Sequence, residues 1–86
     1  MAHVHVKVLG VVRLDTGVHE FEAEAERVHD LFPVLLDKAH EAKPDTTVTR
    51  ADLEGCIVLV NQKQSKKSTP LFEGDTVYLM TPVVGG

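Results

Sequence analysis

The sequence predicts a small α+β domain, in which a mixed sheet of four to five strands packs on one main helix. Residues 4–8 alternate between apolar and polar side chains, which is typical of a half-buried strand. Residues 28–39 carry apolar side chains at helical spacing, whereas 57–60 and 76–80 are short apolar runs bounded by turn signals. At 86 residues, the chain has room for one modest core that buries about 60–65% of the unfolded surface.

The first two strands are expected to form an N-terminal hairpin. Val4, Val6 and Val8 mark the buried face of the first strand, which continues to about Leu14. Residues 15–17, Asp-Thr-Gly, are a turn signal. In residues 19–24 glutamates then alternate with other side chains, which predicts a second strand beside the first.

The main helix should begin near Asp30, which is a plausible N-cap, and end before Pro44. Pro33 is compatible with this start because amides in the first turn have no partner within the helix. The apolar stripe that would face the sheet consists of Val28, Leu31, Phe32, Leu35, Leu36 and Ala39.

The second half predicts two further strands joined by loops. Residues 45–55 form a loop with a short turn near 50–53, and the apolar run 57–60 is expected to be buried on both faces. Residues 61–63 are expected to form a turn, and 64–69 are polar and should be exposed. Leu71-Phe72 should pack as a short element. Residues 73–75 then form a tight turn before a strand at 76–80. Pro82 ends that strand because proline cannot donate to the ladder. The domain therefore spans 1–81, followed by an extended tail at 82–86.

Composition excludes several classes of function. The formal charge of −4 argues against nucleic acid as a partner, and no apolar stretch is long enough to span a membrane. Cys56 is the single cysteine and reads as a small buried hydrophobe in a reducing compartment. The N-terminus lacks the features of a signal peptide, so we expect a cytoplasmic protein. A basic cluster at 63–67 suggests a solvated loop, or else a phosphate or partner contact.

The histidines raise the hypothesis of a metal site. His3 and His5 share one face of a strand, and His19 could lie across the hairpin from them. Because no cysteine or carboxylate stands at characteristic spacing, we predict solvent-facing histidines and no metal. The glutamates of 20–26 likewise indicate a solvated face rather than a catalytic carboxylate pair.

The sequence ends in Gly85-Gly86, directly after the apolar extended run 81–84. Glycine is costly to order and has no side chain to pack, so such a tail is poor core material. It suits a segment that threads a narrow channel into the active site of another protein, where the terminal carboxylate reacts.

The last third of the chain resembles the ubiquitin-like sulfur carriers, and among them the small subunit of molybdopterin synthase. The resemblance rests on an apolar strand ending in Val60-Asn61, a leucine before the Gly74-Asp75 turn, and the ending Pro-Val-Val-Gly-Gly at 82–86. It implies the β-grasp fold, which requires the last strand to lie parallel beside the first. This chain departs from the family with Gln62 where glycine is usual, Thr81 where a first proline is common, and Met80 where an aromatic residue is frequent.

The resemblance also implies a mechanism in which the chain is a non-catalytic carrier. An activating enzyme uses ATP to adenylate the Gly86 carboxylate, and a persulfide from a cysteine desulfurase or rhodanese-like donor converts it to a thiocarboxylate. No cofactor would be bound permanently. Pro82, Val83, Val84 and Gly85 would thread the channel of the large synthase subunit. Phe72 and Met80 would form the docking surface, or else complete the core, while Leu71 belongs to the core.

Other functions share these features. A ubiquitin-like modifier would be conjugated to lysines through Gly86. Other carriers of this type supply sulfur for thiamine, cysteine, tungsten cofactor or tRNA thiolation. A third alternative is an interaction module for which the diglycine is incidental.

Overall fold

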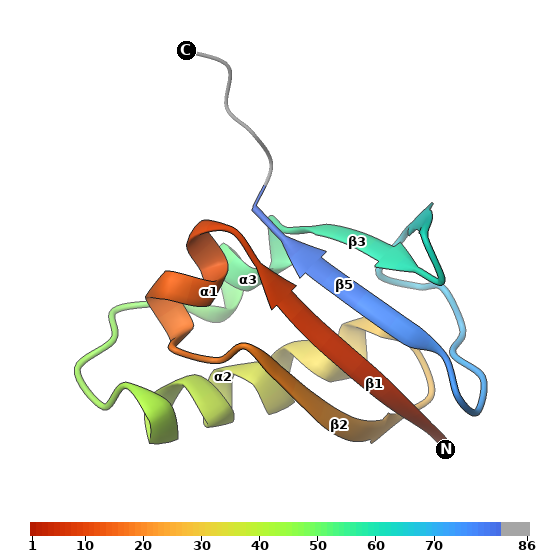
Figure 1. Ribbon diagram of the computed structural model, residues 1–86, viewed down its shortest axis with the longest axis horizontal. Coiled ribbons are helices and arrows are strands. Elements are labelled where there is room, and N and C mark those ends of the chain that lie inside the picture. The colour runs from red at the N-terminus through yellow and green to blue at the C-terminus, as the bar shows by residue number, and fades with distance from the viewer. Residues whose placement is uncertain (82–86) are drawn as a thin grey trace, which may run out of the picture.

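The computed structural model describes residues 1–81 and has a single five-stranded mixed sheet, with the long helix α2 lying across one face (Figure 1). The strand order is β2-β1-β5-β3-β4. β1 pairs antiparallel with β2 and parallel with β5. This parallel pairing of the first and last strands confirms the β-grasp. The elements are β1 (Ala2–Leu9), α1 (Val11–Thr16), β2 (Glu20–Ala25), the 3₁₀ turn η1 (Val28–Asp30), α2 (Leu31–Ala42), α3 (Arg50–Glu54), β3 (Ile57–Val60), β4 (Lys63–Ser65) and β5 (Thr76–Met80).

One face of the sheet and the apolar stripe of α2 enclose the core. Every second residue of β1 and of β5 points into it, because side chains alternate across a strand. Phe32 is the largest fully buried side chain, and Leu53 of α3 is also fully buried. The remaining fully buried apolar side chains larger than alanine are Val4, Val6, Val8, Val28, Leu31, Leu35, Val77 and Leu79.

The first strand is shorter than predicted, and a helix replaces its second half. β1 stops at Leu9, and α1 follows Gly10, whose φ of 72° breaks the extended backbone. Val12 and Thr16, four residues apart, are both buried, and the Thr16 hydroxyl donates to the Val12 carbonyl at 2.7 Å. The predicted antiparallel pairing of the first two strands is confirmed, whereas the connection is a helix and not the predicted turn at residues 15–17.

The main helix lies where the apolar stripe predicts it, although its start differs in detail. Asp30 closes η1, and its carboxylate accepts from the backbone N–H groups of Glu26 and Arg27 instead of capping α2. Pro33 lies in the first turn of α2, and Pro44 follows the helix, as predicted. None of the helices within residues 1–81 is both long and apolar enough to cross a membrane.

The polar stretch after β3 contains a strand that the sequence did not predict. β4 pairs antiparallel with β3 through residues 63–65, where we expected only exposed loop. β3 itself alternates: Val58 and Val60 are buried, whereas Ile57 and Leu59 are half-buried. The prediction that this strand is buried on both faces was therefore wrong, because the helices cover only one side of the sheet.

The predicted short element at residues 71–72 is neither helix nor strand. Leu71 is buried in the core, as expected, whereas Phe72 is 68% exposed. The turn that follows is confirmed, with Gly74 at a φ of 85°, a value that favours glycine. β5 then spans the predicted residues.

Candidate functional site

The predicted reactive and channel-binding residues lie outside the described residues. These are Pro82, Val83, Val84, Gly85 and Gly86. The described part of the site consists of Thr81, which is the last described residue and the root of the tail, together with the surface around it.

The root of the tail is attached to the start of α1. The N–H of Val12 donates to the Thr81 hydroxyl oxygen at 3.0 Å, which satisfies one of the amides that the first turn of a helix leaves open. Gly10 lies against this contact, and a Cβ there would meet the Thr81 nitrogen at 3.7 Å. Space would permit that atom, but the φ of 72° disfavours any side chain. Thr81 is thus held from the helical side while β5 holds it from the sheet.

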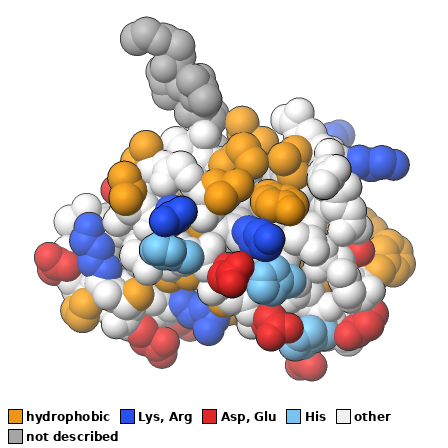
Figure 2. Space-filling model, viewed as in Figure 1, with side chains coloured by type: hydrophobic (Ala, Val, Ile, Leu, Met, Phe, Trp, Pro, Cys, Tyr) orange, Lys and Arg blue, Asp and Glu red, His pale blue; other side chains and the backbone are white. Residues whose placement is uncertain are grey.

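A patch of apolar side chains covers the open face of the sheet next to this root (Figure 2). Met80 of β5 lies between Leu9 of β1 and Ile57 of β3, and Tyr78 lies beside Leu59 in the next row. Leu9 is 36% exposed and the other four are half-buried. We call Leu9, Ile57, Leu59, Tyr78 and Met80 the tail-side patch. A contiguous apolar patch on a small domain is typical of a partner-binding surface.

The other half of the open face is charged and histidine-rich. His3 Nε2 lies 2.9 Å from a Glu22 carboxylate oxygen, and His5 Nε2 lies 3.3 Å from Glu20. The hydrogen bond to Glu22 raises the pKa of His3, and the same contact lowers the pKa of Glu22. His19 precedes β2, and in the described part of the chain no group of three His, Cys, Asp or Glu side chains could hold a metal ion.

The two predicted docking residues lie at different places. Met80 stands at the end of β5 within the tail-side patch, whereas Phe72 precedes the start of that strand. Sequence reasoning missed the three patch members on neighbouring strands, Leu9, Ile57 and Leu59. Their alternation with buried residues was a usable signal, but only the register shows that they adjoin Met80.

The Val60-Asn61 and Gly74-Asp75 motifs are connected to each other by hydrogen bonds. Asn61 Nδ2 donates to Asp75 Oδ1 at 2.8 Å, and the N–H of Thr76 donates to Asn61 Oδ1 at 3.0 Å. The second Asp75 oxygen accepts from the N–H of Phe72 at 2.9 Å. Asn61 and Gln62 both have positive φ, 51° and 72°, so the turn keeps the conformation that Asn-Gly would favour. The missing glycine therefore did not change the kind of turn.

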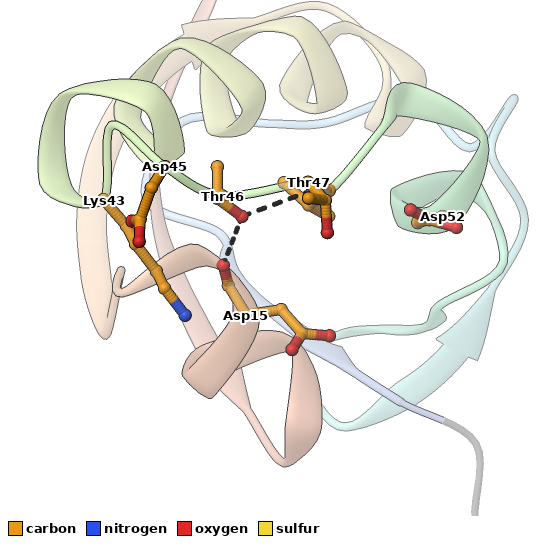
Figure 3. A pocket seen from close by; sticks show the side chains of 7 residues that line it. Asp15, Lys43, Asp45, Thr46, Thr47 and Asp52 are labelled. Atoms are coloured by element: carbon orange, nitrogen blue, oxygen red, sulfur yellow. Dashed lines mark hydrogen bonds between the residues drawn. The ribbon is translucent and has the colours of Figure 1, made fainter.

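A polar hollow of about 220 Å³ lies between α1 and the loop after α2, and Figure 3 shows its lining. The Thr46 hydroxyl donates to the Asp15 carbonyl at 2.6 Å and accepts from the N–H of Val48 at 3.3 Å. Asp15 and Asp52 also line an adjoining hollow that reaches Thr81. Neither lining contains a histidine, cysteine or serine, and the hydrogen bond from Thr46 to Asp15 fastens the loop after α2 to α1.

Cys56, the single cysteine, has a structural role and not a reactive one. Cys56 is partly buried and packs against the core. Burial raises the pKa of its thiol, and the nearby Asp52 carboxylate raises it further. A raised pKa disfavours the thiolate, which is the reactive form.

The comparisons with known proteins identify the family. The profile of the ThiS family matches residues 6–86, which include both the tail-side patch and the tail. The chain belongs to the ThiS family. This family model and the neighbouring structures place it among the ubiquitin-like sulfur carriers and modifiers. No curated protein sequence matches the chain.

Solved structures agree with this ThiS family assignment. A candidate molybdopterin converting factor subunit 1 from Pyrococcus furiosus is 27% identical with a TM-score of 0.67, over 96% of this chain and 100% of that one. Small archaeal modifier protein 1 from Methanosarcina acetivorans is 25% identical with a TM-score of 0.72, over 100% and 98%. The complex of molybdopterin-converting factor subunits 1 and 2 from Helicobacter pylori gives 24% identity and a TM-score of 0.61, over 98% and 99%. At that identity, the third likeness supports the fold alone.

Proposed function

We propose that this ThiS family protein carries sulfur as a thiocarboxylate on Gly86 and acts as the small subunit of a molybdopterin synthase in the cytoplasm. The observation that carries the proposal is the position of the tail-side patch. Met80 is the last residue of β5, just before the root of the tail, and Leu9 and Ile57 flank it on the two neighbouring strands. A partner that covers this patch would therefore receive the tail in its own active site.

The chemistry would follow three steps that leave the carrier body unchanged. ATP converts the Gly86 carboxylate to an acyl adenylate, with release of pyrophosphate. A persulfide on the donor enzyme then attacks the carbonyl and displaces AMP, which gives an acyl disulfide. A second thiol reduces that disulfide, releasing the thiocarboxylate and forming a disulfide in the donor system. The tail residues Pro82 to Gly86 carry no side chain that could act as a general acid or base, so binding and orientation are the contribution of the carrier.

The large-subunit partner is supported by likeness to a subunit of molybdopterin converting factor. The Pyrococcus furiosus protein shares 27% identity over nearly the whole of both chains. The Helicobacter pylori neighbour was solved as a complex with its subunit 2, and it shares the fold. In this chain the corresponding partner would bury the tail-side patch and accommodate Pro82 to Gly86 in a channel.

The experiment that tests the carrier is an intact mass of the untagged protein incubated with its activating enzyme, ATP and a persulfide donor. We expect a species heavier by one sulfur-for-oxygen exchange, mapped to Gly86. A variant with one alanine added after Gly86 is the matched control and should stay unmodified. An unchanged mass for the wild-type chain, or modification of the extended variant, would overturn the proposal.

Docking is tested separately with two substitutions, one at the last residue of β5 and one in the loop before this strand. Met80→Asp places a charge in the tail-side patch and should abolish binding of the large subunit. Phe72→Asp, 68% exposed in the wild type, should leave that binding intact. Equal loss in both variants would contradict docking on the open face.

A second candidate function is conjugation to lysines through Gly86. The likeness to small archaeal modifier protein 1, at 25% identity, favours it. Because both functions begin with adenylation, the distinguishing result is covalent ladders on other proteins in cells that express the tagged chain. A diglycine remnant on lysines of those proteins would establish conjugation. If deletion of Gly85 and Gly86 caused no loss of function, both proposals would be wrong and the protein would be an interaction module instead.

A further inference from the structure

A second apolar surface lies at the opposite end of β5 from the root of the tail. Phe72 is 68% exposed and borders a shallow hollow of about 300 Å³. Val60, Pro70 and Lys63 also line this hollow. We call these four residues the Phe72 hollow. A large aromatic side chain so exposed in a domain with few aromatics is an anchor available to a partner.

The Phe72 hollow does not belong to the open face of the sheet. Lys63 stands opposite Val60 in the register of β3 and β4, and Val60 faces the core side. The tail-side patch lies on the other face and at the other end of the strand. A partner at the Phe72 hollow could therefore hold the body while the tail occupies an active site elsewhere.

The residues on and directly after β4 carry positive charge, although the chain as a whole carries −4. Lys63 lines the hollow, and Lys63, Lys66 and Lys67 are all exposed; within residues 1–81, Lys67 alone among them has a carboxylate partner, Glu54 at 3.5 Å. Asp75 also lines the hollow, but both of its oxygens already accept hydrogen bonds within the domain. These hydrogen bonds leave the negative charge of Asp75 in place; the exposed charged side chains on β4 and directly after it are nevertheless all lysines.

The strand beside the hollow is an edge of the sheet. β4 is the last strand in the order, and within residues 1–81 nothing pairs with its outer side. An edge strand offers backbone donors and acceptors to an added strand, and pockets beside it select the side chains of that strand.

We propose that the Phe72 hollow and the β4 edge bind an extended segment of a partner protein, in which a large apolar side chain is flanked by carboxylates. The apolar side chain would enter the hollow against Phe72 and Pro70. The carboxylates would meet Lys63 and Lys66. This site is additional to the proposed sulfur transfer and independent of which acceptor receives the sulfur.

The test uses the full ¹⁵N-labelled chain and a synthetic peptide, acetyl-Asp-Glu-Phe-Val-Asp-Glu-amide, followed by amide chemical shifts. We expect shifts in residues 63–66 and 70–72 that saturate, and binding that weakens as salt is added. Phe72→Ala should weaken binding about tenfold, as truncation of an anchor residue does. Lys63→Glu should weaken it further, whereas a peptide with lysines in place of the acids should not bind.

Leu14→Ala is the matched control, since Leu14 is 71% exposed on α1, away from the hollow. It should bind the peptide like the wild type. Three results would overturn the proposal: unchanged affinity in Phe72→Ala, shifts confined to the tail-side patch, or the same lysine shifts with inorganic phosphate. Sedimentation that shows a dimer for the wild type and a monomer for Phe72→Ala would overturn it too, because a second copy would then occupy the hollow. Measurement of Gly86 thiocarboxylate is unaffected by any of these, so failure here is separable from failure of the carrier.

Discussion

Removal of the Thr81 hydroxyl should loosen the root of the tail by an amount that the structure sets. Thr81→Val keeps the shape of the side chain but deletes the acceptor 3.0 Å from the N–H of Val12. Val12 is only 7% exposed, so water is a poor substitute for the lost acceptor. Loss of a helix-capping acceptor costs about 1 kcal/mol. For a domain of this size that corresponds to a fall in Tm of roughly 4–8 °C.

The assay pairs thermal unfolding with hydrogen exchange at the Val12 amide. Thr81→Ser is the matched control, because it retains the hydroxyl, and it should stay close to the wild type. In Thr81→Val the Val12 amide should exchange about fivefold faster, the factor that corresponds to about 1 kcal/mol. If the serine and valine variants have the same Tm and the same exchange rate, the hydroxyl does not anchor α1 and the reasoning fails.

Three further predictions concern the turn and the open face. Gln62→Gly should raise stability by about 0.5–1 kcal/mol in urea unfolding, because it relieves a φ of 72° in a non-glycine residue; a lower midpoint would contradict this. Asn61→Ala removes both hydrogen bonds to Asp75 and Thr76 and should cost about 1–2 kcal/mol in the same assay, unlike a surface change. For His3, whose pKa is raised by Glu22, the pair is fully charged between the lowered pKa of Glu22 and the raised pKa of His3. The stabilising effect of the pair is therefore present around pH 4.5–6.5, and it fades above the His3 pKa and below the Glu22 pKa. The effect of the pair should vanish in Glu22→Gln. An NMR titration of His3 in the wild type and in this variant checks the prediction.

The sequence was most informative where local chemistry and burial agree. β5 has the predicted bounds because a Gly-Asp turn precedes it and its alternation is regular. The stripe of α2 was equally clear, since its apolar residues repeat at helical spacing over three turns. Both elements are long enough, relative to their period, for the pattern to be read directly.

Sequence patterns failed where tertiary contacts override propensity. The Val11-Val12 pair is typical of a strand, yet α1 forms because Gly10 breaks β1 and the Thr81 hydroxyl accepts from Val12. β4 is polar and three residues long, so nothing but its pairing with β3 reveals it. In each case the deciding partner lies more than 60 residues away or on another strand.

In the candidate site too, some residues could be predicted from local sequence and others depend on tertiary contacts. The diglycine and the residues before it could be assigned from sequence, and they remain predictions because they lie beyond Thr81. The tail-side patch could be predicted only through Met80, since the neighbours of Met80 depend on register. Phe72 was expected in the same surface, but proximity in sequence to β5 does not place a residue at the same end of it.

β5 is fixed at both ends by side-chain hydrogen bonds, and this determines where the tail begins. At its start, Asn61 holds the N–H of Thr76; at its end, Thr81 holds the N–H of Val12. Pairing with β1 and β3 sets the register of β5, and the two side-chain hydrogen bonds restrain its end residues against fraying, which would otherwise vary the position of the last residue relative to Leu9 and Ile57. Because both ends are fixed, the tail departs from one point on the tail-side patch. We therefore expect the Thr81 and Asn61 variants to weaken large-subunit binding together, although only Thr81 lies near that surface. If Thr81→Val alone weakened large-subunit binding, contacts near the tail would determine that binding and the Asn61 hydrogen bonds at the start of β5 would not.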